Sequence, residues 1–248
     1  MKTVLCMMMC VYFLGMTLVA QDRYFFSPAT PGTSARMIRL GWVEGMSDKS
    51  DSVFENPAAL YRVNSLSASF FTTQFMNEVN YLNGAIALRL PDQLGVLGLG
   101  FMTLGVNDIP ETSKTETISG DPQYFISDYF NYENSLFKVS YQFSASRYVH
   151  YGISGSYYHV KFHTVEGKGY NMDLGMVLTN RTFDFSVMVR NFVSSNDIVY
   201  KDSYNVEGME WNNSDGQVEN LPLESVYSLR YKLRHFSFFG QLKSVGSN

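Results

Sequence analysis

Long runs in which apolar and polar residues alternate one by one are the feature that most constrains this chain. From Leu136 to Ser144, phenylalanine, valine and tyrosine occupy every second position, with lysine, serine and glutamine between them. A period of two places the two kinds of residue on opposite faces of a β-strand. We expect nine such strands, over residues 65–73, 80–90, 95–106, 128–144, 148–163, 168–179, 182–193, 222–233 and 235–243.

The predicted strands are long for a water-soluble protein. Many cover about 9–12 residues, the length that a tilted strand needs to cross a membrane, whereas strands of ordinary sheets average about 5–6 residues. Glycines recur inside them, for example Gly98, Gly100, Gly152 and Gly175, which suits the curvature of a barrel wall. The fold class that we predict is all-β, an antiparallel transmembrane β-barrel.

The connections between the predicted strands alternate in length. Every second one is very short (91–94, 145–147, 180–181 and 234), and the others include two long polar loops, 107–127 and 194–221. Up-and-down membrane barrels have short turns on the periplasmic side and longer loops outside. A soluble exported β-sandwich that binds a ligand also alternates within its strands and is the competing interpretation, but it gives no reason to sort loops in this way.

The first twenty residues read as a secretory signal peptide and not as part of the fold. Lys2 precedes an apolar run that ends in small residues before Gln21, and this run is short for a membrane anchor, the alternative interpretation. Both cysteines, Cys6 and Cys10, lie inside it, so the mature chain is predicted to have no thiol chemistry. The formal net charge of −4 gives no basic surface for nucleic acid.

A helix start precedes the first predicted strand, at Asn56, Pro57 and Ala58. Asparagine is a favoured cap, and proline at the first helical position already has the required φ. We expect one or two helical turns here.

This region resembles the N-terminal part of the FadL-like outer-membrane proteins, in particular the PorV/PorQ group and its uncharacterised relatives. In that group a small-Ala-Arg, a Leu-Gly and an Asn-Pro-Ala motif occur in this order ahead of the barrel. The corresponding residues, with those of later similar motifs, are 34–36, 40–41, 56–58, 151–158, 173–175, 190–192 and 221–223, so the resemblance spans about 34–243. Trp42, Glu44 and Ala59 depart from the pattern, and the family's barrel is longer than this chain.

The resemblance implies a division of the chain and a location. It implies a plug formed by residues 21–64, with Asn56 as a hydrogen-bonding residue, followed by a barrel over 65–248 in the bacterial outer membrane. It also implies a role in transport of hydrophobic solutes or in protein secretion; the alternative within the family is a type IX secretion subunit that anchors exported proteins at the cell surface. The implied partners are membrane lipid, hydrophobic small molecules or secretion-system proteins.

The number of predicted strands is odd. Bacterial barrels close with an even number, and the chain lacks the terminal aromatic strand that outer-membrane proteins usually present. We therefore expect a truncated or unusually short member with an open edge.

Charged residues lie on the polar faces of the predicted strands and are expected to face the lumen. They are Arg89, Lys138, Asp173, Asp184, Arg190 and Arg230. They can pair across strands, which we favour, or line a site for the plug or for the head group of a ligand.

No motif in the sequence points to catalysis or to a cofactor. His159 and His163 are four residues apart, which on a strand is about 13 Å and too far for one metal ion. Gly-x-Ser-x-Gly is absent. We predict no enzyme, no metal site and no cofactor.

Overall fold

The structure is a computed structural model that describes residues 27–116, 122–193, 198–202, 218–219 and 221–246. The predicted signal peptide, residues 1–20, lies outside this part of the chain. The fold is one antiparallel sheet of 11 strands, which confirms the predicted all-β class. Its strands are β1 (Leu66–Phe75), β2 (Val79–Arg89), β3 (Val96–Glu116), β4 (Pro122–Ser144), β5 (Val149–Phe162), β6 (Val165–Thr179), β7 (Phe183–Arg190), β8 (Ile198–Asp202), β9 (Val218–Glu219), β10 (Glu224–Lys232) and β11 (Ser237–Val245).

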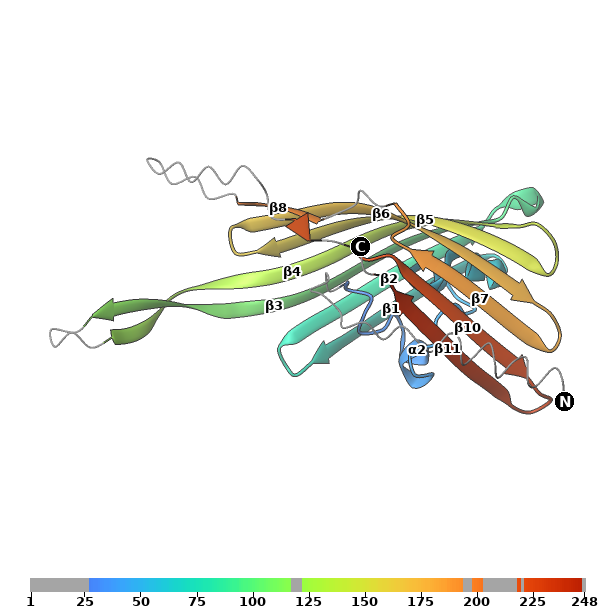
Figure 1. The fold of residues 1–248 in the computed structure, drawn as a ribbon, viewed down its shortest axis with the longest axis horizontal. Helices are drawn as coiled ribbons and strands as arrows, with labels where there is room; N and C mark the ends of the chain where they lie inside the picture. The colour runs from blue at the N-terminus through green and yellow to red at the C-terminus, as the bar shows by residue number, and fades with distance from the viewer. Residues whose placement is uncertain (1–26, 117–121, 194–197, 203–217, 220, 247–248) are drawn as a thin grey trace.

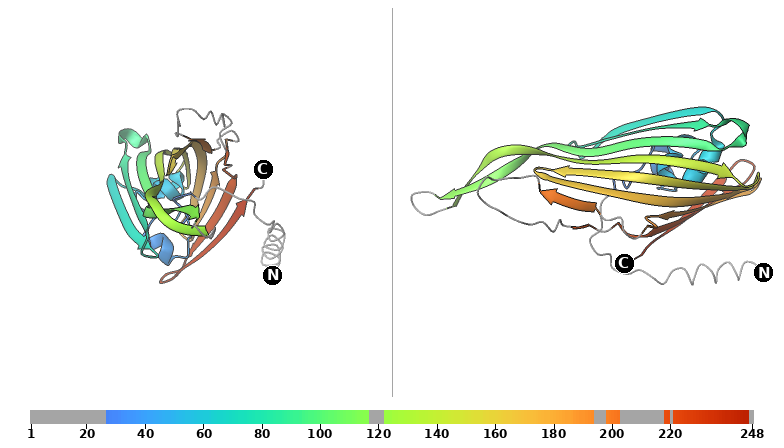
Figure 2. Two further views of the ribbon diagram at one scale, coloured as in Figure 1. Left: turned by 90° about the vertical axis from the view of Figure 1, so that its left-hand side faces the viewer. Right: turned by 90° about the horizontal axis from the view of Figure 1, so that it is seen from above.

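The strands follow one another in a strongly curved sheet that does not close. The path runs β1-β2-β3-β4-β5-β6-β7-β10-β11, and each of these nine strands overlaps one of the nine predicted segments. Within the described residues β1 pairs only with β2, and β11 only with β10. The sheet therefore does not close into a barrel, in agreement with the open edge that the odd number of predicted strands led us to expect. Figure 2 shows the sheet curving around the short helices.

The predicted loop 107–127 is wrong over most of its length. β3 continues to Glu116 and β4 begins at Pro122, so the two strands form a ribbon that projects beyond the rest of the sheet (Figure 1). Register shifts after Val106 and after Glu111 mark the ribbon. These strands lack regular alternation, because residues 107–116 are mostly polar and residues 124–126 are three consecutive apolar residues. The second predicted loop, 194–221, also contains two short strands. β8 pairs with residues 165–168 at the start of β6, and β9 pairs with β8.

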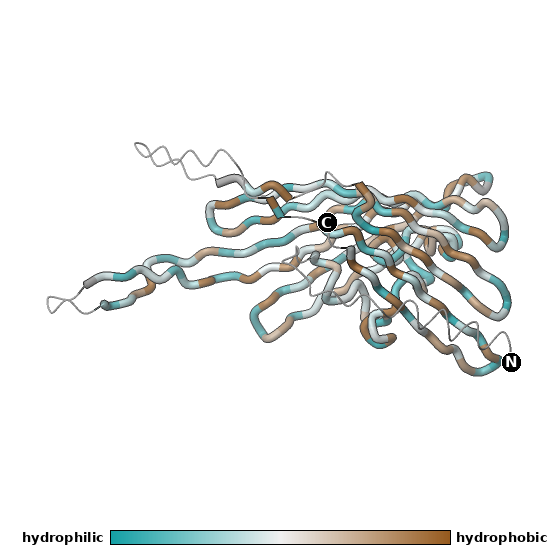
Figure 3. Tube along the Cα trace, in the orientation of Figure 1, coloured by the Kyte–Doolittle hydropathy of each residue, from teal (hydrophilic) through white to brown (hydrophobic). Residues whose placement is uncertain are grey.

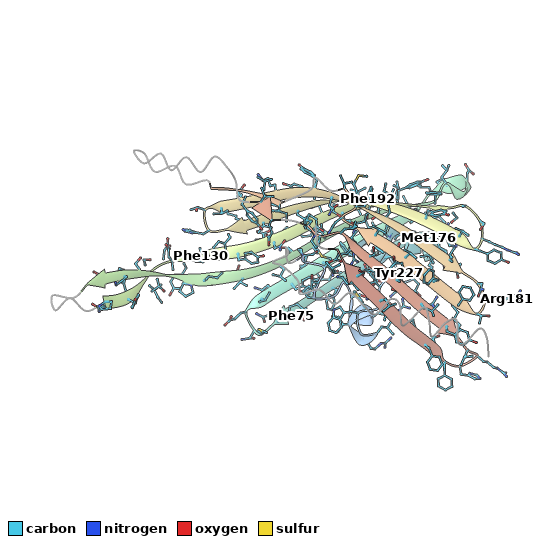
Figure 4. All side chains as sticks on the ribbon, in the orientation of Figure 1. Phe75, Phe130, Met176, Arg181, Phe192 and Tyr227 are labelled. Carbon is cyan, nitrogen blue, oxygen red and sulfur yellow. The ribbon has the colours of Figure 1, made fainter. Side chains whose placement is uncertain are left out.

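The four connections predicted to be very short, 91–94, 145–147, 180–181 and 234, lie at one end of the sheet. Figure 4 places Arg181 at this end and Phe75 and Phe130 toward the opposite one. One short turn contains the helix η2 (Pro91–Gln93), and in another the Asn180 side chain accepts hydrogen bonds from the backbone N–H groups of Thr182 and Phe183. At the opposite end, however, β1 joins β2 through residues 76–78 and β5 joins β6 through residues 163–164, connections as short as those at the first end, so the predicted sorting of turns by length is found only in part.

The two faces of the sheet have the polarity that the alternation predicts, with the apolar face exposed. On β4, Phe137 is 56% exposed, whereas Ser140 and Gln142 are 1% and 0% exposed. The same holds for Leu99 and Leu174, which are exposed, beside buried polar residues on the inner face. Figure 3 shows this alternation along the strands, and Tyr227 in Figure 4 belongs to the exposed face of β10.

The N-terminal segment, residues 27–64, packs against the inner face of the sheet. It contains three short helices: α2 (Ala35–Arg39), capped by Ser34; α3 (Ser52–Glu55); and η1 (Pro57–Arg62), capped by Asn56 as the sequence predicts. The apolar core lies between this segment and the sheet, where Val53, Phe54 and Leu60 are buried against strand residues. No helix in the described ranges is long and apolar enough to cross a membrane.

Candidate functional site

Glycines on the inner face allow the N-terminal segment to lie directly on the strands. A methyl group added at Gly152 of β5 would overlap the backbone of Pro57 and Ala58, and one at Gly175 of β6 would overlap the Asn56 side chain. On β3, methyl groups at the two inner glycines would meet Val53, Leu60 and Phe54. We call these four residues the glycine seat: Gly98, Gly100, Gly152 and Gly175. These glycines therefore recur for a second reason besides the curvature of the wall: without side chains, they let the N-terminal segment approach the strands closely.

Asn56 joins the N-terminal segment to β7. Its side chain is fully buried. The amide nitrogen donates to Ser186 Oγ at 2.8 Å and to the backbone oxygen of Val187 at 3.0 Å, while its oxygen accepts from the Ala58 N–H at 2.9 Å. Pro57 and Ala58 are buried beside it. The three residues of the predicted plug motif therefore lie against the inner face of the sheet.

Lys138 and Asp173 form a buried ion pair across a strand. They lie on β4 and β6, on either side of β5, and Lys138 Nζ is 2.5 Å from Asp173 Oδ2. Ser154 of β5 donates to the same oxygen at 3.2 Å, and the Asn191 N–H donates to the other oxygen. With both charges 4% exposed, these hydrogen bonds offset the cost of removing the pair from water.

Asp184 is the centre of a second cluster. It is fully buried on β7 and pairs with Arg230 and Lys232 of β10. Arg62 of η1 is 3.6 Å from the same carboxylate. Burial lowers the pKa of Arg62 below its usual value. The cluster therefore combines cross-strand pairing with a contact to the N-terminal segment.

Arg190 links β7 to both β10 and the N-terminal segment. It pairs with Glu44 of that segment and with Glu224 of β10, the latter at 3.4 Å. Its guanidinium also donates to the Glu55 backbone oxygen at 3.2 Å. Lys243 of β11 pairs with Glu224 at 2.8 Å.

Arg89 is the sixth predicted lumen-facing residue, and it binds the end of the N-terminal segment. It donates to the backbone oxygens of Tyr61 and Val63 at 2.6 and 2.7 Å. Tyr61 in turn stacks on His150 of β5, with the ring centroids 3.6 Å apart. The structure therefore separates the six predicted residues into four groups: Lys138–Asp173, Asp184–Arg230, Arg190 and Arg89. Every group except Lys138–Asp173 contacts the N-terminal segment directly.

Glu55 is a buried carboxylate at the centre of the N-terminal segment. Its oxygens accept hydrogen bonds from Thr33 Oγ1 at 3.2 Å and from the Gly45 N–H at 3.0 Å. Burial, together with the nearby charges of Asp51 and Glu44, raises its pKa from 4.5 to about 8. The segment thus holds this group in its neutral form near neutral pH.

Residues 42–50 connect the two edges of the sheet on its inner side, and we call them the clasp. At β11, Gln241 accepts from the Glu44 N–H at 2.7 Å and donates to the Trp42 backbone oxygen at 3.0 Å. At β1, Ser50 bonds through its backbone and its hydroxyl to Ser67 and Ser69.

A cavity of about 270 Å³ lies between the N-terminal segment and the inner face. Its polar lining carries charges of both signs: Lys138, Arg190 and Lys243 opposite Glu44, Asp173 and Glu224. Met37, Trp42, Phe54 and Leu136 line other parts of it. Such a lining suits a small molecule with an apolar body and a polar or zwitterionic end.

The described residues contain no group of three or more His, Cys, Asp or Glu side chains that could hold a metal ion. Sequence reasoning did not select Glu44, Glu55 or Arg62, which are central to the site. The sequence offered two signals for this site: the recurring glycines on the inner face and the carboxylates just before Asn56. It could not show what these residues contact, because their partners lie far away in the chain.

No family model matches the chain, and comparisons with curated proteins and with solved structures likewise give no match.

Proposed function

We propose that this chain is an outer-membrane β-sheet protein of the FadL/PorV-like class, whose apolar outer face lies in lipid. The observation that carries the proposal is the inverted polarity of the sheet. Water-soluble proteins bury apolar side chains and rarely expose large contiguous apolar patches. Here the outer face exposes Phe, Leu, Tyr, Val and Ile on successive strands, and the inner face buries serine, asparagine and paired charges.

The sandwich alternative fits this arrangement poorly. In a sandwich the apolar faces of two sheets meet and the polar faces point to solvent. In this protein a single sheet curves with its polar face inward, and the N-terminal segment covers that face. If the outer face lies in lipid, its exposed apolar side chains are in a favourable environment and need no second sheet to cover them.

In this proposal the N-terminal segment is the plug of the lumen, and the cavity beside it takes small amphipathic solutes on their way through the wall. The balanced charges of the cavity favour solutes that carry both a cationic and an anionic group over simple anions. Asn56, the glycine seat and the Arg190–Glu44 pair hold the plug in place.

A pair of arginine substitutions on one strand tests the membrane location. Phe137→Arg places a charge in the apolar face, which costs about 2–4 kcal/mol near the centre of a bilayer. Tyr124→Arg is the matched control, because Tyr124 is 66% exposed on the same strand but lies on the projecting ribbon.

We expect Phe137→Arg to deplete the protein from the outer-membrane fraction, and Tyr124→Arg to leave its amount there unchanged. If both variants fold equally well and dissolve without detergent, the outer face is in water and the proposal is wrong.

A role in protein secretion is the second candidate, and the projecting β3–β4 ribbon favours it. Its exposed Tyr124, Phe125 and Ile126 offer an apolar surface on the projecting ribbon, outside the part of the sheet that we expect to lie in lipid. Secretion predicts co-purification with other translocon proteins and loss of cargo export on removal of the ribbon, whereas solute transport predicts uptake that persists without it.

A further inference from the structure

Three arginines lie on three turns at the same end of the sheet. Arg147 is on the turn between β4 and β5, Arg181 on the turn between β6 and β7, and Arg234 on the turn between β10 and β11. Figure 4 shows Arg181 at this end. We call this end, formed by residues 91–94, 145–148, 180–182 and 233–236, the turn rim.

Backbone hydrogen bonds hold these turns side by side. The Thr179 N–H donates to the Tyr148 backbone oxygen at 2.9 Å, and the Lys232 N–H donates to the Thr182 backbone oxygen at 2.7 Å. Turns that are two strand spacings apart are separated by about 10 Å. The three arginines therefore form a row along the rim, and none of them lines the cavity on the inner side of the sheet.

The arginines of this row carry charges that no carboxylate neutralises. All three are exposed, and none of them forms an ion pair with a described residue. The guanidinium of Arg147 lies over the Tyr148 ring, with Cζ 4.5 Å from the ring centroid. Arg230 of the inner face, by contrast, pairs with the buried Asp184. Asp92 is the one acidic residue of the rim, so the rim attracts anions.

An exposed aromatic ring accompanies each arginine. Tyr148, Phe183 and Phe236 follow the three arginines by one or two positions and are 48%, 39% and 70% exposed. Aromatic rings are enriched where a membrane protein passes from hydrocarbon to head groups, and long cationic side chains there extend their charge toward water. The repeated arginine and aromatic residue fit the head-group region of a bilayer better than a soluble anion, which offers the rings no apolar layer.

The opposite end of the sheet has the opposite balance of charge. The turn between β1 and β2 carries Glu78, and the described part of the β3–β4 ribbon carries more acidic than basic residues: Asp108, Glu111, Glu116 and Asp128 against Lys114. An anionic layer would therefore attract the turn rim and repel the other end.

We propose that the turn rim binds the phosphate groups of anionic lipids, with the three guanidinium groups on the phosphates and the neighbouring rings at the level of the head groups. The inference rests on the proposed membrane location and adds the class of lipid that this end of the sheet prefers. A guanidinium group can bind phosphate through two parallel hydrogen bonds. Each arginine near an anionic surface contributes about a fivefold preference.

Tryptophan quenching in vesicles of mixed lipid tests this. After the native Trp42 and Trp211 are replaced by phenylalanine, a tryptophan replaces Phe183 at the rim. In the matched control it replaces Tyr170, which is exposed on the outer face of β6 nearer the opposite end. The vesicles contain phosphatidylcholine and phosphatidylglycerol, and one or the other lipid is brominated. We expect phosphatidylglycerol to be enriched about fivefold or more around position 183, and not around position 170.

Two sets of substitutions assign this enrichment to the arginines. The first removes the charges of the rim: Arg147→Gln, Arg181→Gln and Arg234→Gln. The second removes as many exposed charges from the opposite end: Lys114→Gln, Lys161→Gln and Lys168→Gln. We expect the first set to abolish the enrichment at position 183 and the second set to preserve it. The first set should fold normally, because the three arginines are exposed and unpaired.

Three results would overturn the proposal: equal quenching by the two brominated lipids at position 183, an enrichment that survives the arginine substitutions, or its loss when inorganic phosphate replaces chloride at the same ionic strength, which would indicate a site for a free anion. If brominated lipid quenches both tryptophans without preference, only the lipid class is wrong. If neither is quenched and the protein is recovered without detergent, the proposed function is wrong as well.

Discussion

At the scale of single residues, the absence of side chains on the inner face matters as much as their presence. Gly152 and Gly175 bring the backbone of β5 and β6 into contact with Asn56, Pro57 and Ala58. Close backbone approach is one of the few requirements that only glycine meets. The Asn56 amide then satisfies polar groups that this contact removes from water.

Gly152→Ala tests the glycine seat. The added methyl group would overlap backbone atoms of η1, which cannot move like the end of a flexible side chain. We expect a loss of about 1–3 kcal/mol in the free energy of unfolding, the usual cost of overpacking, measured by urea unfolding in detergent.

The control for this variant is on the same strand. Gly155 faces outward and has no atom near the position of an added methyl group. Gly155→Ala should keep the stability of the wild type or raise it by up to about 1 kcal/mol. Equal effects of the two substitutions would mean that η1 does not rest on β5.

At the scale of elements, the N-terminal segment consists of helices that are too short to be stable alone. α2 has five residues and α3 has four, whereas isolated helices shorter than about 12–15 residues are marginal in water. Their position therefore depends on contacts with the sheet and on hydrogen bonds within the segment, among them the buried ones of Glu55.

The raised pKa of Glu55 predicts how stability varies with pH. Because the folded state keeps its proton up to about pH 8 and the unfolded state loses it near 4.5, the folded state binds more protons between these values. The free energy of unfolding should therefore fall as the pH rises from about 4.5 to about 8. Urea midpoints measured across this range give the slope.

Glu55→Gln should flatten this slope, because the amide does not ionise. Asp48→Asn removes an exposed carboxylate from the same segment and should leave the slope as it is. A slope that survives Glu55→Gln would assign the pH dependence to another group.

At the scale of the whole molecule, the sheet has an apolar exterior and a polar interior. Phe137 and Tyr124 lie on the same strand and are both exposed, yet Phe137 pairs with strands on both sides, with Phe101 of β3 and Tyr157 of β5, whereas Tyr124 lies on the projecting ribbon. The proposal of a membrane protein requires that these two exposed positions have different surroundings.

Tryptophan quenching measures that difference. After Trp42 and Trp211, the only native tryptophans, are replaced by phenylalanine, Phe137→Trp should be quenched strongly by brominated lipids and Tyr124→Trp very little. Weak quenching at both positions would place the whole outer face in water.

Much of the fold followed from the sequence because alternation is a local signal. The segments 80–90, 148–163 and 168–179 were predicted close to β2, β5 and β6. The ribbon of β3 and β4 was missed because it lacks regular alternation: residues 107–116 are mostly polar, whereas Tyr124, Phe125 and Ile126 are consecutive apolar residues that are all exposed. Backbone pairing, and not the burial of one face, maintains the strands there. The Asn56 cap was predicted because capping depends on neighbouring residues.

The sequence by itself determined the strand order, the polarity of the two faces and the helix start at Asn56, since each depends on residues close together in the chain. Only the tertiary structure decided which charges meet and that the glycines seat η1. Arg190 and Glu44 are 146 positions apart, and no local pattern links them. Their contact exists because the sheet curves and carries β7 over the N-terminal segment.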